Sequence, residues 1–194
     1  MNSDRRRVHR QVAELHAQCI DGGFLSTLGP RFLALLYEAI DASPDGVLLV
    51  EEDGGHVNGF ISGAGNLRTI RDALLRRPLR LGLALLPALT PRRLARIVET
   101  LRYTNTDADG LPTAELLSIA VAPANRGCGI AERLYRRLSS HWQQRGVEAF
   151  RIVVGDGLAP AQKFYRRMGA VPAGQLHLHA GQGSTVFVAQ TDQR

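Results

Sequence analysis

Residues 116–138 read LLSIAVAPANRGCGIAERLYRRL and decide the fold of this 194-residue chain. The apolar run that contains Ile119 and Val121 is suited to a β-strand that is covered on both faces. Pro123 ends this run, because proline cannot donate a hydrogen bond to a sheet. A turn of small residues follows, and the apolar side of the next segment carries Ile130, Leu134 and Leu138. The sequence therefore predicts a buried strand, a sharp turn and an amphipathic helix.

The turn between this strand and this helix has the chemistry of an anion-binding site. Gly127, Gly129 and Ala131 are small enough to let a ligand approach the main chain closely. The first turn of a helix has free N–H groups and the positive end of the helix dipole. Such a turn binds a phosphate or pyrophosphate without dedicated side chains. We therefore expect a phosphorylated ligand at this position.

Two other glycine-rich phosphate sites do not fit the sequence. A dinucleotide fingerprint needs G-x-G-x-x-G, but Glu132 occupies the sixth position and Arg133 follows it. A P-loop needs a lysine in G-x-x-x-x-G-K-[ST], and the only lysine of the chain is Lys163. The alternative that Gly127 and Gly129 merely shape a tight turn stays open.

Two blocks of sequence resemble the GNAT superfamily of N-acetyltransferases. The pattern Arg126-x-x-Gly129-x-Ala131 is similar to the family's acyl-coenzyme A signature, Q/R-x-x-G-x-G/A. The second block, FRIVVGDGLAPAQKFYRRMGA at residues 150–170, resembles the strand and helix that follow in the family. It ends in the common pattern FY-x-x-x-G, formed by Phe164, Tyr165 and Gly169. The resemblance covers roughly the last third of the chain. It implies an α/β fold with a GNAT-type mixed, mostly antiparallel sheet flanked by helices.

The resemblance also implies acetyl-CoA as the co-substrate, without a metal. The acyl and pantetheine portion would contact the main chain of the motif strand, at Ile119, Ala120 and Val121. A main-chain N–H of this strand would face the oxyanion that develops on the thioester. The pyrophosphate would be cradled by the residues of the turn, namely Arg126, Gly127, Cys128, Gly129, Ile130 and Ala131.

Two residues are candidates for the proton transfers. Tyr165 stands at the family's usual tyrosine position, where a phenol would protonate the departing thiolate. Glu115, at the head of the motif strand, is the candidate base, as in relatives whose glutamate acts through water. The alternatives are a core aromatic for Tyr165 and a solvent-facing carboxylate for Glu115. The rival bases are the histidines of the expected hairpins, His56, His177 and His179.

One position departs from the family pattern. Many relatives have an asparagine seven residues before the tyrosine, where it caps the helix and contacts the coenzyme. This chain has Leu158 at that position, and Asp156 is the candidate replacement for the cap. The departure puts one coenzyme contact in doubt.

The remaining sequence predicts alternating helices and strands. Helices are expected at Val8–Ile20 and Arg31–Ile40, and a hairpin turn at Asp53, Gly54 and Gly55. The other expected strands are Val47–Val50, Val57–Ser62, Phe150–Val154, Leu176–His179 and Thr185–Ala189. We therefore expect a single GNAT domain over residues 1–194.

A helical insertion is expected at residues 66–110, between the third and fourth strands. Its expected helices are Leu67–Arg77, Leu79–Leu89 and Pro91–Tyr103. An apolar stripe consists of Leu79, Leu83, Leu86 and Leu89, and a basic rim consists of Arg71, Arg76, Arg77, Arg80, Arg92, Arg93 and Arg96. The open readings are a packed flap, a lid over an anionic acceptor, a dimer surface and a contact with an anionic membrane.

Composition restricts the remaining classes of protein. Usage of 44% hydrophobic and 22% charged residues is typical of a globular domain. No stretch approaches the ~20 apolar residues of a membrane span, and no signal peptide is recognisable. Two cysteines, Cys19 and Cys128, imply neither a disulfide framework nor a zinc cluster. We therefore expect a cytoplasmic protein without integral membrane association.

The net charge of +6 favours anionic ligands, coenzyme A among them. Nucleic acid is not expected, because the arginines are scattered and aromatic residues make up only 6% of the chain. The leading hypothesis is an N-acetyltransferase that transfers the acetyl group of acetyl-CoA to a small-molecule amine, for instance an anionic or sugar amine. The alternatives are acetylation of a protein N-terminus or lysine, and a non-catalytic module that binds acyl-CoA. A homodimer is left open.

Overall fold

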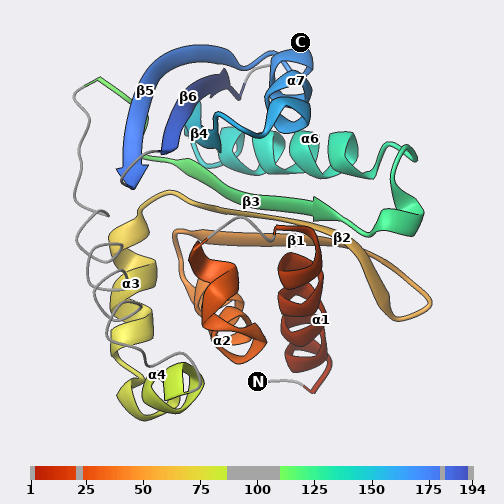
Figure 1. Cartoon of the computed structure of the whole chain (residues 1–194), viewed down its shortest axis with the longest axis vertical. Helices are drawn as coiled ribbons and strands as arrows, with labels where there is room; N and C mark the ends of the chain where they lie inside the picture. Colours follow the sequence, from red (N-terminus) through yellow and green to blue (C-terminus); the bar gives the residue numbers. More distant parts are fainter. Residues whose placement is uncertain (1–2, 21–23, 87–109, 180–181, 192–194) are drawn as a thin grey trace.

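The computed structural model describes residues 3–20, 24–86, 110–179 and 182–191, and is built on one six-stranded sheet (Figure 1). The strands follow the order β1-β2-β3-β4-β6-β5, and every neighbouring pair is antiparallel except β3 and β4. Their bounds are β1 Gly46–Asp53, β2 His56–Ala64, β3 Glu115–Val121, β4 Ala149–Gly155, β5 Val171–His179 and β6 Gln182–Gln190. The expected mixed, mostly antiparallel GNAT-type sheet is confirmed.

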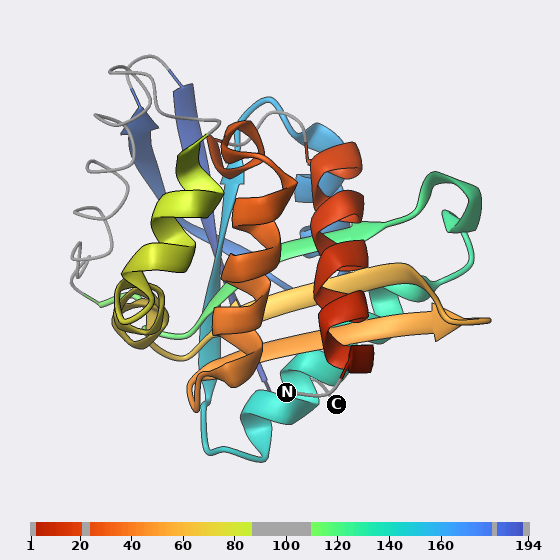
Figure 2. The same ribbon diagram turned by 90° about the horizontal axis from the view of Figure 1, so that it is seen from below.

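Helices cover both faces of this sheet, as the two views in Figures 1 and 2 show. One face is covered by α1 Ser3–Cys19, α2 Pro30–Ala42, α3 Leu67–Leu75 and α4 Pro78–Leu85. The other face is covered by α6 Ile130–Gln143 and α7 Ala159–Arg167. Short 3-10 turns occur at Phe24–Leu28 and Pro123–Asn125. The sheet is therefore the middle of three layers.

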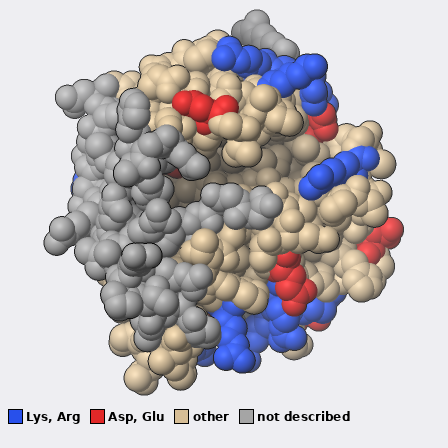
Figure 3. All heavy atoms as spheres, viewed as in Figure 1, with Lys and Arg blue, Asp and Glu red and all other residues tan. Residues whose placement is uncertain are grey.

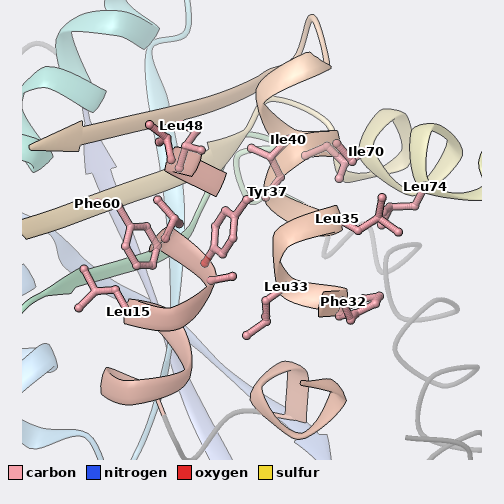
Figure 4. Close-up of a cluster of buried hydrophobic side chains, with 14 of the residues drawn as sticks. Leu15, Phe32, Leu33, Leu35, Tyr37, Ile40, Leu48, Phe60, Ile70 and Leu74 are labelled. Carbon is pink, nitrogen blue, oxygen red and sulfur yellow. The ribbon is translucent and has the colours of Figure 1, made fainter. Parts of the chain in front are cut away.

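The first core cluster lies between the sheet and α1 and α2 (Figure 4). Leu33, Tyr37 and Ile40 of α2 are almost fully buried and face Phe60 of β2. Their spacing of three and four residues places them on one side of the helix. Burying one such side chain stabilises the fold by about 1.5–3 kcal/mol, so α2 is held firmly on the sheet.

The second core cluster lies under α6. The predicted apolar side of this helix is confirmed, since Ile130, Leu134 and Leu138 are all buried. They share one cluster with Ile61 of β2 and Phe150 of β4. Helix α6 therefore packs against both halves of the sheet, on either side of the β3–β4 pair.

Several predicted boundaries are confirmed, and those of the last hairpin are corrected. The glycine turn after Asp53 connects β1 and β2 as expected. The last two strands are longer than predicted, because β5 begins at Val171 and β6 at Gln182. Register shifts interrupt their pairing near Pro172 and near His177, and such irregularities hide the alternating pattern on which the prediction relied.

The predicted position of the insertion between the third and fourth strands is wrong, because it lies between the second and third, β2 and β3. Its described part contains two helices, but the predicted apolar stripe does not pack. Helix α3 ends at Leu75, and α4 follows from Pro78 to Leu85. The stripe residues Leu79, Leu83 and Leu86 are exposed, while α4 packs through Leu81, Ala84 and Leu85. The predicted helix Pro91–Tyr103 and the stripe residue Leu89 lie outside the described residues.

Candidate active site

Strands β3 and β4 part soon after they meet. Their parallel pairing consists of Glu115 with Arg151 and Leu116 with Ile152. At the same point the register of β2 and β3 shifts, so that Leu117 is an extra residue in β3. Such a β-bulge bends a strand and increases its local twist. The bulge therefore marks the place where β3 turns away from β4 and a gap opens in the sheet.

The main chain of β3 beyond the bulge faces this gap. The N–H of Ala122 donates to the carbonyl of Asn58 in β2 at 2.8 Å. In an antiparallel ladder, alternate residues direct their main-chain groups to the same neighbour. Ala120 and Ser118 therefore point toward β2, whereas Ile119 and Val121 point toward the gap. An extended ligand in the gap can pair with these two residues as a strand would.

The glycine turn at the end of β3 leads into α6. Gly127 and Gly129 have φ angles of 79° and 72°, the left-handed region that favours glycine. The first hydrogen bond of the helix runs from the N–H of Arg133 to the carbonyl of Gly129. Within the described part of the chain, no carbonyl accepts a hydrogen bond from the N–H groups of residues 127–131. The turn therefore presents a set of free donors at the positive end of a helix dipole.

The charged side chains around this turn are held by other parts of the protein. Arg126 donates to the carbonyl of Val121 at 3.3 Å, and Arg133 donates to the carbonyl of Cys128 at 2.9 Å. The carboxylate of Glu132 pairs with Arg167 at 2.7 Å. Hydrogen bonding to its own main-chain N–H, together with Arg167, holds the pKa of Glu132 below its usual range. Two guanidinium groups therefore lie beside the free donors.

Cys19, at the end of α1, is a further residue of this site. Its thiol lies 3.7 Å from the carbonyl of Val121 and 3.6 Å from Nη2 of Arg126. The sequence analysis missed this residue as part of the site, because its contacts span more than a hundred positions and no local pattern announces them. Cys128, by contrast, is exposed on the turn, and both thiols are free.

Tyr165 lies inside the protein, on α7. Its side chain is 5% exposed and packs among aromatic rings, with Tyr135 at 6.3 Å and Phe187 at 6.4 Å between centroids. Burial raises the pKa of its phenol, and the proximity of Tyr135 adds to the shift. The hydroxyl therefore stays protonated at neutral pH, as a proton donor must.

Glu115 is a buried partner in an ion pair and not the solvent-facing carboxylate of the alternative reading. Its Oε2 accepts a hydrogen bond from Nε of Arg151 at 2.8 Å, and the two side chains are 15% and 18% exposed. Burial raises the pKa of Glu115, although Arg151 works in the opposite direction. The pair lies at the closed end of the gap. The histidine rival His56 is exposed, and the side chains of His177 and His179 lie outside the described residues.

The predicted cap of α7 is wrong. Asp156 Oδ1 accepts a hydrogen bond from the hydroxyl of Thr185 in β6 at 2.9 Å and therefore faces the sheet. The residue before the helix is Leu158, which supplies no capping hydrogen bond and is 55% exposed. The aspartate is held by β6, which the sequence pattern of α7 alone does not show.

Two arginines of the basic rim lie against α2, whereas the rim residues Arg92, Arg93 and Arg96 lie outside the described residues. Arg77 and Arg80 both pair with Glu38 of α2, and Arg71 pairs with its neighbour Asp72. A hollow of about 590 Å³ beside Arg80 is lined by described residues of α1, α2 and α4 and by none of β3 or β4. Figure 3 shows basic side chains at the upper and lower margins of one face, which is hollowed near its middle. The arginines that line the hollow of the helix layer are Arg6, Arg10, Arg31 and Arg80.

The described residues contain no group of histidine, cysteine or carboxylate side chains that could hold a metal ion. In the same part of the chain, no helix is both long and apolar enough to cross a bilayer.

A parted pair of parallel strands beside a glycine turn with free N–H groups fits the acyl-coenzyme A signature that the sequence resembles. The model of the Acetyltransferase (GNAT) family matches residues 11–170, and the chain belongs to this family. It is a GNAT-family acetyltransferase, an enzyme that uses acetyl-CoA. No curated protein matches the sequence.

Solved structures share the fold at low sequence identity. The protein SsHAT is 20% identical, with a TM-score of 0.66 over 100% of this chain and 96% of its own. An N-acetyltransferase from Staphylococcus aureus Mu50 is 14% identical, with a TM-score of 0.61 over 96% and 94%. An aminoglycoside 6'-N-acetyltransferase complexed with coenzyme A is 14% identical, with a TM-score of 0.60 over 96% and 92%.

Replacing Arg151 with Met should destabilise the protein by roughly 3–5 kcal/mol at neutral pH, because Glu115 then remains buried without a partner. The loss should depend on pH. Without Arg151 the folded-state pKa of Glu115 rises further. Below pH 4.5, the ordinary pKa, Glu115 is protonated in both states and costs no stability through its charge. The loss of stability then grows as the pH increases through the folded-state pKa. Urea unfolding of both proteins at acidic and neutral pH measures this difference.

The double variant Arg151→Met with Glu115→Gln is the matched control. It removes the buried charge and should recover much of the lost stability at neutral pH. A deficit that is independent of pH, or that the second substitution leaves unchanged, contradicts this account of the pair.

Proposed function

We propose that this enzyme transfers the acetyl group of acetyl-CoA to a primary amine of a small molecule by direct attack. The observation that carries the proposal is the gap between β3 and β4, which ends at the free donors of the glycine turn. A thioester held there lies between a strand with unpaired main-chain groups and a helix that begins with a positive dipole. Such an arrangement holds a long, phosphorylated co-substrate along its whole length.

Each part of this site has a proposed role. Ile119 and Val121 hold the acyl and pantetheine portion through the main chain, and a main-chain N–H of this stretch faces the developing oxyanion. Ala120, which the sequence also predicts as a contact, lies between them and directs its main-chain groups to β2. Stabilising the charge of the oxyanion commonly lowers the activation free energy by a few kcal/mol. The residues that hold the diphosphate are those of the turn, Arg126, Gly127, Cys128, Gly129, Ile130 and Ala131.

Two side chains have proposed roles in moving protons. Tyr165 protonates the departing thiolate; its place in the FY-x-x-x-G pattern supports this role, whereas the raised pKa of its phenol makes the proton harder to donate. Glu115 collects the amine proton through water. Its raised pKa supports this role, whereas Arg151 occupies one of its oxygens. We also propose a cytoplasmic location, supported by two free cysteines in a chain of this length.

The proposed diphosphate site predicts that a side chain at Gly127 blocks coenzyme binding. Nothing lies within 4 Å of the position of a Cβ at Gly127, so a side chain would fill the space proposed for the diphosphate. Gly127→Val should weaken the binding of coenzyme A by at least about tenfold in calorimetry, which corresponds to ~1.4 kcal/mol.

Gly146→Val is the matched control. Gly146 has a φ angle of 72° and an equally open Cβ position, but it lies in the turn between α6 and β4. Both variants therefore carry the same backbone strain, and only the first should lose affinity. Equal losses, or no loss at Gly127, contradict the assignment.

A panel of amines tests the proposed activity through the release of free thiol from acetyl-CoA. Small primary amines should accelerate thiol release, and phosphorylated or acidic sugar amines are the finer proposal for the acceptor. The basic side chains near the helix layer support that finer proposal only through their charge. A preference for spermine, which is a polycation, contradicts the proposal of an anionic acceptor. Acetylation of peptides alone favours the alternative of a protein substrate, and binding without thiol release favours a non-catalytic module.

The role of Tyr165 predicts a selective loss of turnover. Tyr165→Phe removes only the hydroxyl, so the affinity for coenzyme A should stay within about twofold while turnover falls by about a hundredfold. Tyr135→Phe removes a hydroxyl from the same aromatic cluster and should have a smaller effect on turnover. Unchanged turnover in Tyr165→Phe removes the assignment.

A further inference from the structure

A chain of hydrogen bonds crosses the first core cluster, from α1 to the bulge of β3. Nδ1 of His16 lies 2.5 Å from the hydroxyl of Tyr37, which lies 2.9 Å from the hydroxyl of Ser118. Ser118 is also 2.7 Å from the hydroxyl of Ser62 on β2. In Figure 4, Tyr37 points from α2 toward the sheet, beside Phe60. Four elements, α1, α2, β2 and β3, thus contribute to one continuous polar network.

This path is buried among apolar side chains. His16 is 4% exposed, Tyr37 1% and Ser62 not at all. The ring of His16 stacks on Phe60, and its Nε2 has no hydrogen-bond partner among the described residues. A buried polar atom without a partner costs about 1–3 kcal/mol. A phenylalanine at position 16 would avoid that cost, so packing alone gives no reason for a histidine.

The protonation states of the path suit proton transfer. Burial lowers the pKa of His16 to about 4, so its ring is neutral at physiological pH. Burial also raises the pKa of Tyr37, which keeps its hydroxyl protonated. Each hydroxyl on the path can accept one hydrogen bond while it donates another.

The outer end of the path lies at the proposed active site. Ser118 is half-buried and directly follows the bulge residue Leu117. Its neighbour Ile119 directs its main chain into the gap between β3 and β4. The path therefore connects a buried ring nitrogen with the point at which the two strands part.

We propose that Ser118, Tyr37 and His16 form a proton path for the acceptor amine, with Ser118 at the entrance and Nδ1 of His16 as the inner acceptor. The proposal rests on the proposed acetyl transfer. It gives the amine proton a destination besides Glu115, of which one oxygen is already bound to Arg151.

The transfer balances as a relay of single protons. One N–H bond of the protonated amine breaks as the proton binds Oγ of Ser118, and the electron pair that stays on the nitrogen forms the new C–N bond. Ser118 passes its own proton to the oxygen of Tyr37, and Tyr37 passes its proton to Nδ1 of His16. The imidazolium is disfavoured by burial, so after the products have left it returns the proton along the same path to water in the gap.

Two substitutions interrupt the path, one at each of its hydroxyls. Tyr37→Phe and Ser118→Ala should each lower kcat for an alkylamine by about a hundredfold, with the KM for acetyl-CoA unchanged. Ser118→Thr keeps a hydroxyl and should retain most of the activity. The control Ser139→Ala removes another buried serine hydroxyl, bonded to the carbonyl of Thr191, and should leave kcat unchanged.

Comparison of an aromatic amine with an alkylamine as the acceptor separates a role in proton transfer from a structural role. An aromatic amine is already unprotonated at neutral pH, so Tyr37→Phe should slow its acetylation much less than that of an alkylamine. Equal losses for both amines, or a matching loss in coenzyme A affinity, overturn the proposal. Turnover of the wild-type protein on the same panel decides the proposed function separately.

The tautomer of His16 gives a readout that needs no turnover. An inner proton acceptor requires a bare Nδ1 that receives the Tyr37 hydroxyl, with the proton on Nε2. Nitrogen NMR of the labelled protein should show this tautomer, and Tyr37→Phe should shift the Nδ1 resonance. A resting ring protonated at Nδ1 would falsify the path.

Discussion

The loss of pairing between β3 and β4 is the constraint on which the rest of the structure depends. A parallel pair that stops after two residues leaves main-chain groups of Ile119 and Val121 without a strand partner, in the middle of a sheet. Unpaired main-chain donors and acceptors are costly in a protein interior, so such a gap is stable only where water or a ligand reaches it. Helix α6 keeps the two halves together, because its core cluster includes Ile61 of β2 and Phe150 of β4. The gap is therefore a fixed feature of the fold.

In the proposed site, main-chain groups bind the two long parts of the co-substrate, its pantetheine arm and its diphosphate. A pantetheine arm presents amides at intervals, which an exposed strand can pair with, and a diphosphate presents oxygens, which N–H groups at a helix start can bind. Neither task needs a particular side chain, but the second needs φ angles that only glycine adopts at low cost. Arg126 is fixed on the carbonyl of Val121, so its charge is placed before any ligand arrives. Placing groups beforehand reduces the entropy cost of binding.

The sequence predicts the parts of this site that are local, and fails where distant segments meet. The strand, turn and helix at residues 116–138 follow from Pro123, the glycines and the apolar spacing alone. The bulge at Leu117 depends on how β2 aligns with β3, and the partner of Glu115 depends on the parallel register that places Arg151 beside it. The sequence predicts that Asp156 caps α7, because this helix is its neighbour along the chain. In the structure its carboxylate is bound by Thr185 of β6, which is distant in sequence.

Two buried polar systems lie beside the gap, on the same face of the sheet. They are the ion pair of Glu115 with Arg151 and the hydrogen-bond chain from His16 to Ser118. Arg151 lies between Phe150 and Ile152, which face α6, so the ion pair with Glu115 lies on the side of α1 and α2. The chain through Tyr37 reaches Ser118 from the same side. Replacing a buried ion pair or a hydrogen-bonded pair by apolar residues is often neutral or stabilising, so stability alone does not explain either system. Both systems meet β3 within four residues of each other, at the place where the proposed chemistry occurs. Under that proposal the acceptor amine approaches from the face covered by α1 and α2.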